Sequence, residues 1–246
     1  MTAGWILPSV TLIVASSVGG ELALALRAYS LSCALTTLAF SIFILSIGLA
    51  LAFMVLTVYF DRLIVHGFPP GKSIVSSFIA SGPFGQAGFS VLNIGNIMKE
   101  TLPVPGSRSP FLNSTQTGEI AFTLCVCLSF VLWAFATMWI VYGLLGLQHV
   151  FRRGRITFDL SFWGMIFPNV SHGRSLLCWI VLYNYSQGVY AILTVALYQT
   201  LDVTFFRVWG TTYSIFTIIL WFLFLCRTAV DVPGGRIFDA PCLKET

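Results

Sequence analysis

The side chains best suited to catalysis or metal binding do not gather into a recognisable site in this sequence. His66, His149 and His172 have no partnered nucleophile, so solvated loop histidines explain them better than general bases do. The six cysteines form no Cys-x-x-Cys pair and lie mostly within apolar runs, where a free thiol behaves as a small apolar side chain. We therefore expect no enzyme, no metal site and no cofactor.

The glycine-rich string GPFGQAG, residues 82–88, has some likeness to a nucleotide-binding loop. No strand-like run precedes it and no Gly-Lys-Ser/Thr sequence follows it, so a bend in a helix explains it better. The net charge of +4 does not imply nucleic acid as a partner either. The charges lie in gaps between apolar runs, where orientation in a bilayer explains them first.

Uncharged polar side chains and glycines gather around three prolines, in a pattern that could serve the passage of a small anion. Proline inside a helix removes a backbone hydrogen bond, which a bilayer tolerates where neighbouring protein or a water-filled cavity completes it. Hydroxyl and amide groups can then favour an anion without a fixed charge. The residues that we expect to line a pore or bend a helix are Pro8, Thr11, Ser16, Gly19, Ser77, Ser81, Gly82, Pro83, Gln86, Gly164 and Pro168. The alternative is that the small residues only allow close helix packing.

Fixed charge is sparse along the same stretches. Apart from Arg174, we expect no charged residue in the middle of a proline-containing run, because Glu21 falls in the gap after the first run. Asp159 stands near the start of the fifth run, where a carboxylate suits a helix N-terminus. A proton-coupled carrier more often places an ionisable group within the membrane. The sequence therefore predicts a neutral pore rather than a buried carboxylate relay.

The composition of the chain requires that these residues be positioned by membrane helices. Hydrophobic residues make up 57% of the 246 residues and charged residues 9%, with a mean hydropathy of +0.89, whereas an ordinary soluble domain is about a quarter charged. At roughly 20 apolar residues per crossing, the chain has room for about six or seven spans. The runs fall near 4–20, 29–60, 73–97, 118–147, 156–200 and 204–228. The predicted fold class is an all-α, polytopic membrane helix bundle in one domain, 1–246.

The prolines Pro8, Pro83 and Pro168 all fall in the odd-numbered runs, and the even-numbered runs contain none. This alternation predicts an inner ring of proline-kinked helices around a pore. The even runs are rich in Phe, Leu, Ile and Trp, which suits straight outer helices that contact lipid or another subunit.

Positive residues gather in alternate gaps, which predicts how the chain is oriented. They are Arg62, His66 and Lys72 after the second run, Arg152, Arg153 and Arg155 after the fourth, and Arg227, Arg236 and Lys244 after the last. We expect these gaps and a C-terminal tail, 229–246, to be cytoplasmic. The gap 101–117 is then external, and its Asn113-Ser114-Thr115 triplet is a candidate glycosylation site at Asn113.

Six strings, in this order, carry a resemblance to a known family. They are WILPSVTLIVASSVGG (5–20), YFDRLIVHGFPP (59–70), GPFGQAGFSVLNIG (82–95), GEIAFTLCVCLSFVLWAF (118–135), FDLSFWGMIFPN (158–169) and GVYAILTVAL (188–197). The sequence resembles the tellurite-resistance and dicarboxylate transporters, which include plant slow anion channels, fungal malate permeases and fungal sulfite efflux pumps. The resemblance implies ten helices in five hairpins around a pore, often as a homotrimer. It covers the C-terminal six helices, so we expect an N-terminally truncated chain holding roughly the last three hairpins.

The resemblance also implies a gate. In the family, a phenylalanine within a Trp-x-x-x-Phe-Pro pattern plugs the pore, and the segment from Trp163 to Pro168 matches that pattern with Phe167 in the plugging position. An aromatic ring that fills the lumen excludes water and ions, so a smaller side chain there should open the path.

The sequence departs from the family pattern directly after this site. Relatives would run from FPN into GVYAILT, but residues 170–187 intervene here. Val170-Ser171 can be encoded by GTGAGT and Gln187 by CAG, which are the sequences of a splice donor and acceptor. We expect 170–187 to be a retained intron. The alternative is a genuine loop of this protein.

These patterns together predict transport of a small anion through a lipid bilayer. We expect sulfite efflux across the plasma membrane, and the alternative substrate is a C4-dicarboxylate such as malate. The alternative from another class is an inactive, truncated membrane fragment. Nucleic acid is not an expected partner.

Overall fold

The computed structural model describes residues 3–67, 77–104, 109–153 and 188–231. Within these ranges every regular element is a helix, which confirms the all-α prediction. The elements are η1 (Ala3–Ile6), α1 (Leu7–Arg27), α2 (Leu31–His66), α3 (Ser81–Thr101), α4 (Pro110–Asn113), α5 (Thr115–Arg153), α7 (Val189–Leu201) and α8 (Thr204–Asp231).

Four of the described helices are long and apolar enough to cross a membrane. Their apolar segments are Leu7–Arg27, Leu31–His66, Gln116–His149 and Thr204–Val230. Helix α3 is as long as α1 but carries more polar side chains. Helix α7 has 13 residues and so spans about 20 Å at 1.5 Å per residue, less than the hydrocarbon core of a bilayer. The described residues therefore form a membrane bundle in which α7 is too short to cross the bilayer by itself.

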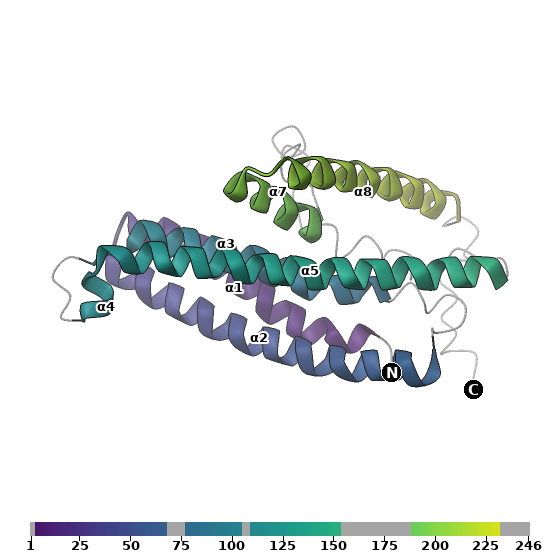
Figure 1. Ribbon diagram of the computed structural model, residues 1–246, viewed down its shortest axis with the longest axis horizontal. Helices are drawn as coiled ribbons and strands as arrows, with labels where there is room; N and C mark the ends of the chain where they lie inside the picture. Colours follow the sequence, from purple (N-terminus) through teal and green to yellow (C-terminus); the bar gives the residue numbers. More distant parts are fainter. Residues whose placement is uncertain (1–2, 68–76, 105–108, 154–187, 232–246) are drawn as a thin grey trace.

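The helices pack as three hairpins: α1 with α2, α3 with α5, and α7 with α8 (Figure 1). The first helices of the hairpins also contact one another in series, α1 with α3 and α3 with α7. Helices α1 and α3 run parallel, because Ser17 meets Ser90 and Arg27 meets Glu100 at the same sequence offset. We call α1, α3 and α7, through which the three consecutive hairpins contact one another, the inner helices.

The start of each inner helix differs from the prediction. The sequence placed Pro8 and Pro83 inside their runs, but both lie in the first turn of an α-helix, directly after a 3-10 turn at 3–6 or 77–80. Proline is tolerated there because the first backbone N–H groups of a helix have no intrahelical acceptor. Serine hydroxyls donate hydrogen bonds to carbonyl groups of the two 3-10 turns. Ser9 Oγ donates to the carbonyl of Ile6 at 2.7 Å, and Ser81 Oγ donates to the carbonyl of Phe78 at 2.8 Å. The irregular backbone therefore stands at the head of each helix.

Glycines allow the helices to approach closely. A Cβ atom on Gly48 of α2 would lie 2.9 Å from Cγ1 of Ile13 and 3.2 Å from the carbonyl oxygen of Ser9 on α1. A Cβ atom on Gly95 of α3 would lie 2.6 Å from Cβ of Cys125 on α5. In a bilayer, close packing replaces the hydrophobic drive for helix association, so these contacts stabilise the hairpins.

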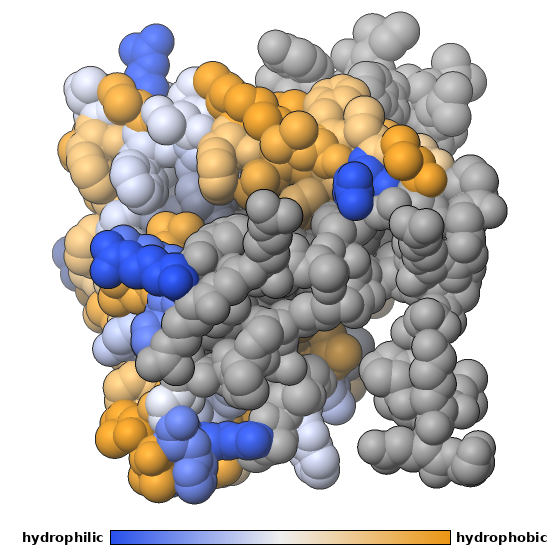
Figure 2. Space-filling view, turned by 90° about the vertical axis from the view of Figure 1, so that its right-hand side faces the viewer, coloured by the Kyte–Doolittle hydropathy of each residue, from blue (hydrophilic) through white to orange (hydrophobic). Residues whose placement is uncertain are grey.

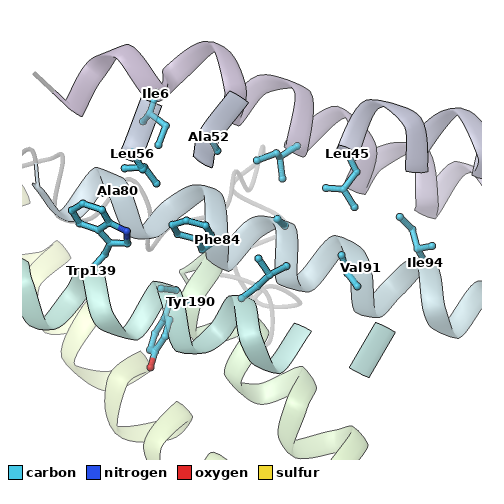
Figure 3. Packing of buried hydrophobic residues seen from close by; sticks show 14 of the residues in the cluster. Ile6, Leu45, Ala52, Leu56, Ala80, Phe84, Val91, Ile94, Trp139 and Tyr190 are labelled. Carbon is cyan, nitrogen blue, oxygen red and sulfur yellow. The ribbon is translucent and has the colours of Figure 1, made fainter. Parts of the chain in front are cut away.

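The core lies around α3, which contacts α1, α2, α5 and α7. Figure 3 shows Phe84 of α3 among side chains from the neighbouring helices, with Leu56 of α2, Trp139 of α5 and Tyr190 of α7 nearby. These four residues are almost fully buried. Helix α3 is thus the central element of the described bundle.

The surface of the described bundle is largely apolar. Large exposed hydrophobic side chains cover α2, α5 and α8, and orange patches dominate the coloured part of Figure 2. Only 11% of the apolar segment of α8 is buried inside the protein. Soluble monomers rarely expose apolar patches of this extent, whereas a lipid-facing helix requires them.

Candidate functional site

A row of polar side chains runs along the contact between the parallel inner helices α1 and α3. We call this row the α1–α3 seam, and it comprises Ser17, Glu21 and Arg27 of α1 with Gln86, Ser90, Asn93 and Glu100 of α3.

The first part of the seam is uncharged. Gln86 Nε2 donates to Ser17 Oγ at 2.7 Å, Ser17 and Ser90 share a hydrogen bond between their hydroxyls, and Ser90 Oγ donates to the carbonyl of Gln86 at 2.9 Å. Ser17 and Ser90 are buried, whereas Gln86 is half-buried. Both hydroxyl protons are used within this row, so the second N–H of the Gln86 amide is the donor left for an anion, which such a neutral group can hold briefly and then release.

The second part of the seam carries charge. Asn93 Nδ2 donates to Glu21 Oε1 at 2.7 Å, and Arg27 Nη1 forms an ion pair with Glu100 Oε2 at 2.9 Å. Both the arginine and the glutamate of that pair are well exposed, so the pair has the position of a surface salt bridge and contributes little to stability.

The spacing of the residues explains why the seam forms. Ser17 and Glu21 are four residues apart, and Gln86, Ser90 and Asn93 follow at four and three, so each set occupies one helical face. Gly20 lies between the two helices, where an added Cβ atom would meet Asn93 Nδ2 at 3.4 Å. At this ordinary van der Waals distance, Gly20 packs beside the hydrogen bond between Asn93 and Glu21.

The placement of Glu21 corrects the expectation that the inner helices lack fixed charge. Helix α1 continues to Arg27 rather than ending near residue 20, so Glu21 stands within it. Its side chain is exposed, as are Thr11, Val14 and Val18 at spacings of three and four residues. We call these four residues the open face of α1.

The structure divides the predicted site residues among three settings. Gln86 lies in the seam, whereas Thr11 lies on the open face and donates to the carbonyl of Pro8 at 2.7 Å. Pro8 is also exposed. The third setting is packing between helices or beside the 3-10 turn, and it holds the half-buried Gly19 with the buried residues Ser16, Ser77, Ser81, Gly82 and Pro83.

Two residues of this third setting, Gly19 and Ser77, contact the outer helix α2. A Cβ atom on Gly19 would clash with Oγ of Ser41, and Ser77 shares a 2.9 Å hydrogen bond with the hydroxyl of Tyr59. Ser16 is fully buried, and its hydroxyl has no hydrogen-bond partner among the described residues. At Gly19 and Ser77, the small size of the residue allows close packing against α2.

Sequence reasoning missed Ser90, Asn93 and Glu21 as members of the site. The one-turn spacing of Gln86, Ser90 and Asn93 was a usable signal for a polar helix face. Glu21 carried no comparable signal, because its role depends on where α1 ends.

A second polar cluster, also not predicted, joins α5, α7 and α8. Trp209 Nε1 donates to the hydroxyl of Tyr190 at 2.8 Å, and that hydroxyl shares a hydrogen bond with Thr137 Oγ1 at 2.8 Å. Trp133 Nε1 donates to Thr194 Oγ1 at 2.9 Å. Because Tyr190 stands in the first turn of α7, the cluster fixes the beginning of this short helix against its neighbours.

Several predicted features lie outside the described residues. These are the candidate gate Phe167, with Gly164 and Pro168, the suspected insertion 170–187, and most of the C-terminal tail 229–246. Asn113, the candidate glycosylation residue, is described as the exposed last residue of α4.

Comparison with known proteins gives a consistent family. Residues 1–229 match the voltage-dependent anion channel family. The sulfite efflux pumps SSU1 of Arthroderma benhamiae and Trichophyton rubrum are each 28% identical over 238 residues, which is 97% of this chain and 56% of theirs. The sulfite efflux pump SSU1 of Candida albicans is 28% identical over 181 residues, covering 68% of this chain and 35% of its own. The chain thus spans little more than half the length of the first two relatives and about a third of the length of the Candida albicans one. No solved structure matches it.

Proposed function

The chain belongs to the voltage-dependent anion channel family, and from this premise we propose that it forms part of a pore that moves sulfite out of the cell. Membership of the family supports transport of an anion across a membrane, and the names of the fungal relatives support sulfite.

The α1–α3 seam is the observation that carries this proposal. Its uncharged first part places the half-buried amide of Gln86 beside the buried hydroxyls of Ser17 and Ser90 on parallel inner helices, and no cation belongs to this part of the seam. Sites for ions that must pass rapidly need such weak, repeated contacts. In the proposal, sulfite passes along the open face of α1 and the adjoining part of the seam.

The proposal assigns further roles to residues predicted from the sequence. Phe167 closes the pore, and Thr11 and Gln86 face the route of the anion. Pro8 and Pro83 shape the heads of the inner helices, with Gly164 and Pro168 doing so for the third. The pore assembles as a homotrimer in the plasma membrane.

The distribution of charge supports a cytoplasmic C-terminus. Arg62, Arg152 and Arg227 stand toward the ends of α2, α5 and α8, the three helices that return to the same end of the hairpins. Arg27 and Lys99 stand at the other end and are paired with Glu100 and Glu119. An excess of Lys and Arg over the short loops and helix ends marks the cytoplasmic side, whether or not these residues form ion pairs.

Transport assays on the natural full-length gene product test this proposal. Sulfite-loaded liposomes that contain the purified protein should release sulfite faster than sulfite-loaded liposomes without protein. Liposomes that contain the Phe167→Ala variant should release it faster still. Release of malate but not of sulfite would assign the protein to dicarboxylate transport, and release of neither would contradict the proposed function.

A further inference from the structure

Glu21 is a carboxylate at a point where an anion pathway should not have one. It lies on the open face of α1, together with Thr11, Val14 and Val18, which the proposed function places along the route of sulfite. Its Oε1 atom accepts a 2.7 Å hydrogen bond from Asn93 Nδ2. The partner is thus a neutral amide, which orients the carboxylate without cancelling its charge.

The charged groups nearest in the fold are engaged elsewhere. Arg27, six residues further along α1, pairs with Glu100 of α3 at 2.9 Å, and Lys99 of α3 pairs with Glu119 of α5 at 3.3 Å. Helix α2 packs against α1 and contains no charged residue between Leu31 and Phe60. Among the described residues, the cations Arg27 and Lys99 are thus held by other carboxylates, and an ionised Glu21 presents negative charge to an approaching anion.

Such a charge obstructs an anion, and a proton removes the obstruction. Because Asn93 holds Oε1, the Oε2 atom is the one left to take a proton from water on the pathway. The amide of Asn93 can continue to donate to Oε1 after protonation. Gly20 packs beside this arrangement, since a Cβ atom there would lie in ordinary van der Waals contact, at 3.4 Å, with the Nδ2 atom of Asn93.

We propose that Glu21 is a proton-controlled electrostatic gate, which obstructs anions when ionised and admits them once its Oε2 atom has taken up a proton. The inference rests on the proposed function for its substrate. It differs from that function in assigning the pH dependence of transport to one residue of the α1–α3 seam.

Sulfite release from liposomes containing the full-length protein tests the gate. Release by the wild type should be slower at neutral than at acidic pH, and Glu21→Gln should release sulfite about tenfold faster than the wild type at the upper end of the pH range, because it removes a negative charge from the route. The two proteins should converge at the lower end. Sulfite has the same protonation state for both proteins at a given pH, so the ratio of their release rates reports the protein alone.

Glu119→Gln is the matched control. It makes the same chemical change in an exposed carboxylate on α5 that pairs with Lys99 outside the seam. This variant should keep the wild-type pH profile. A Glu21→Gln protein with the wild-type profile would overturn the inference, as would one that is folded but inactive at every pH.

Infrared difference spectroscopy gives a readout that does not require transport. On acidification, the wild type should gain a protonated-carboxyl band that Glu21→Gln lacks and Glu119→Gln retains. If the wild type moves no sulfite, the proposed function fails, and the infrared test of Glu21 still stands. Spectra of the wild type and Glu21→Gln that remain identical would overturn the inference in either case.

Discussion

Single residues decide how closely the helices of this bundle approach and where polar groups meet. Gly48 provides room that any larger side chain would take from α1. Between α1 and α3, the amide of Asn93 on α3 reaches Glu21. Close approach and polar contacts between the helices are therefore both set by individual residues.

Replacement of Gly48 by leucine should destabilise the α1–α2 hairpin. The new side chain would meet Ile13, Leu12 and the backbone of Ser9, and overpacking of this kind costs about 1–3 kcal/mol. Thermal unfolding in detergent measures the effect as a lower midpoint. Ala50→Leu introduces the same side chain at an exposed position of α2 and should leave the midpoint unchanged. Equal midpoints for both variants would show that α1 and α2 do not pack as described.

The sequence predicted Gln86 and Thr11 because amide and hydroxyl groups beside prolines form a visible pattern. It could not predict Glu21, whose position relative to the membrane depends on seven residues of helix beyond the expected end of α1. Contacts such as that of Asn93 with Glu21 join residues 72 positions apart, and local spacing carries no signal for them.

Helices and their ends were predicted with uneven success. Hydrophobic runs identified the long apolar helices because membrane spans require about 20 such residues. The heads of α1 and α3 were predicted less well, since a proline is compatible both with a kink and with a first turn. The clustering of α7 with α5 and α8 through Tyr190 was not predicted, because buried tyrosine and tryptophan residues are common in any helical core.

Tyr190→Phe should loosen the attachment of α7 to its neighbours. The variant removes the hydroxyl that accepts from Trp209 and bonds Thr137, and leaving buried polar groups unsatisfied costs about 1–3 kcal/mol. A lower unfolding midpoint and altered tryptophan fluorescence should report the change. Tyr29→Phe, at an exposed residue between α1 and α2, should alter neither. A Tyr190→Phe protein as stable as the wild type would argue against this role for the cluster.

At the scale of the whole molecule, the described residues form three hairpins, and the inner helices of these hairpins contact one another in series. The sequence predicted that repeat through the alternation of proline-containing and proline-free runs. The suspected insertion 170–187 lies outside the described residues and stays a prediction. Without it, the segment containing Phe167 would continue directly into Gly188 and α7.

A chain lacking residues 170–187 should insert better into membranes than the chain that contains them. Joining Asn169 to Gly188 restores one long apolar segment, whereas the insertion leaves a short and poor span before it. Sequencing of transcripts should reveal a spliced form, and membrane fractionation should show a higher yield for the shorter chain. Genomic DNA without GT and AG at the two boundaries would contradict the splicing explanation, and lower insertion of the shorter chain would contradict the structural one.

The most direct test of the account measures sulfite flux through the full-length protein when the donors of the α1–α3 seam are removed. Gln86→Leu should lower the flux about tenfold or more, since a hydrogen bond to a charged group is worth roughly 1.5–3 kcal/mol. Thr57→Val, which removes an exposed α2 hydroxyl bonded to its own helix, should leave the flux unchanged. Wild-type flux in a stable Gln86→Leu protein would contradict an anion route along this seam.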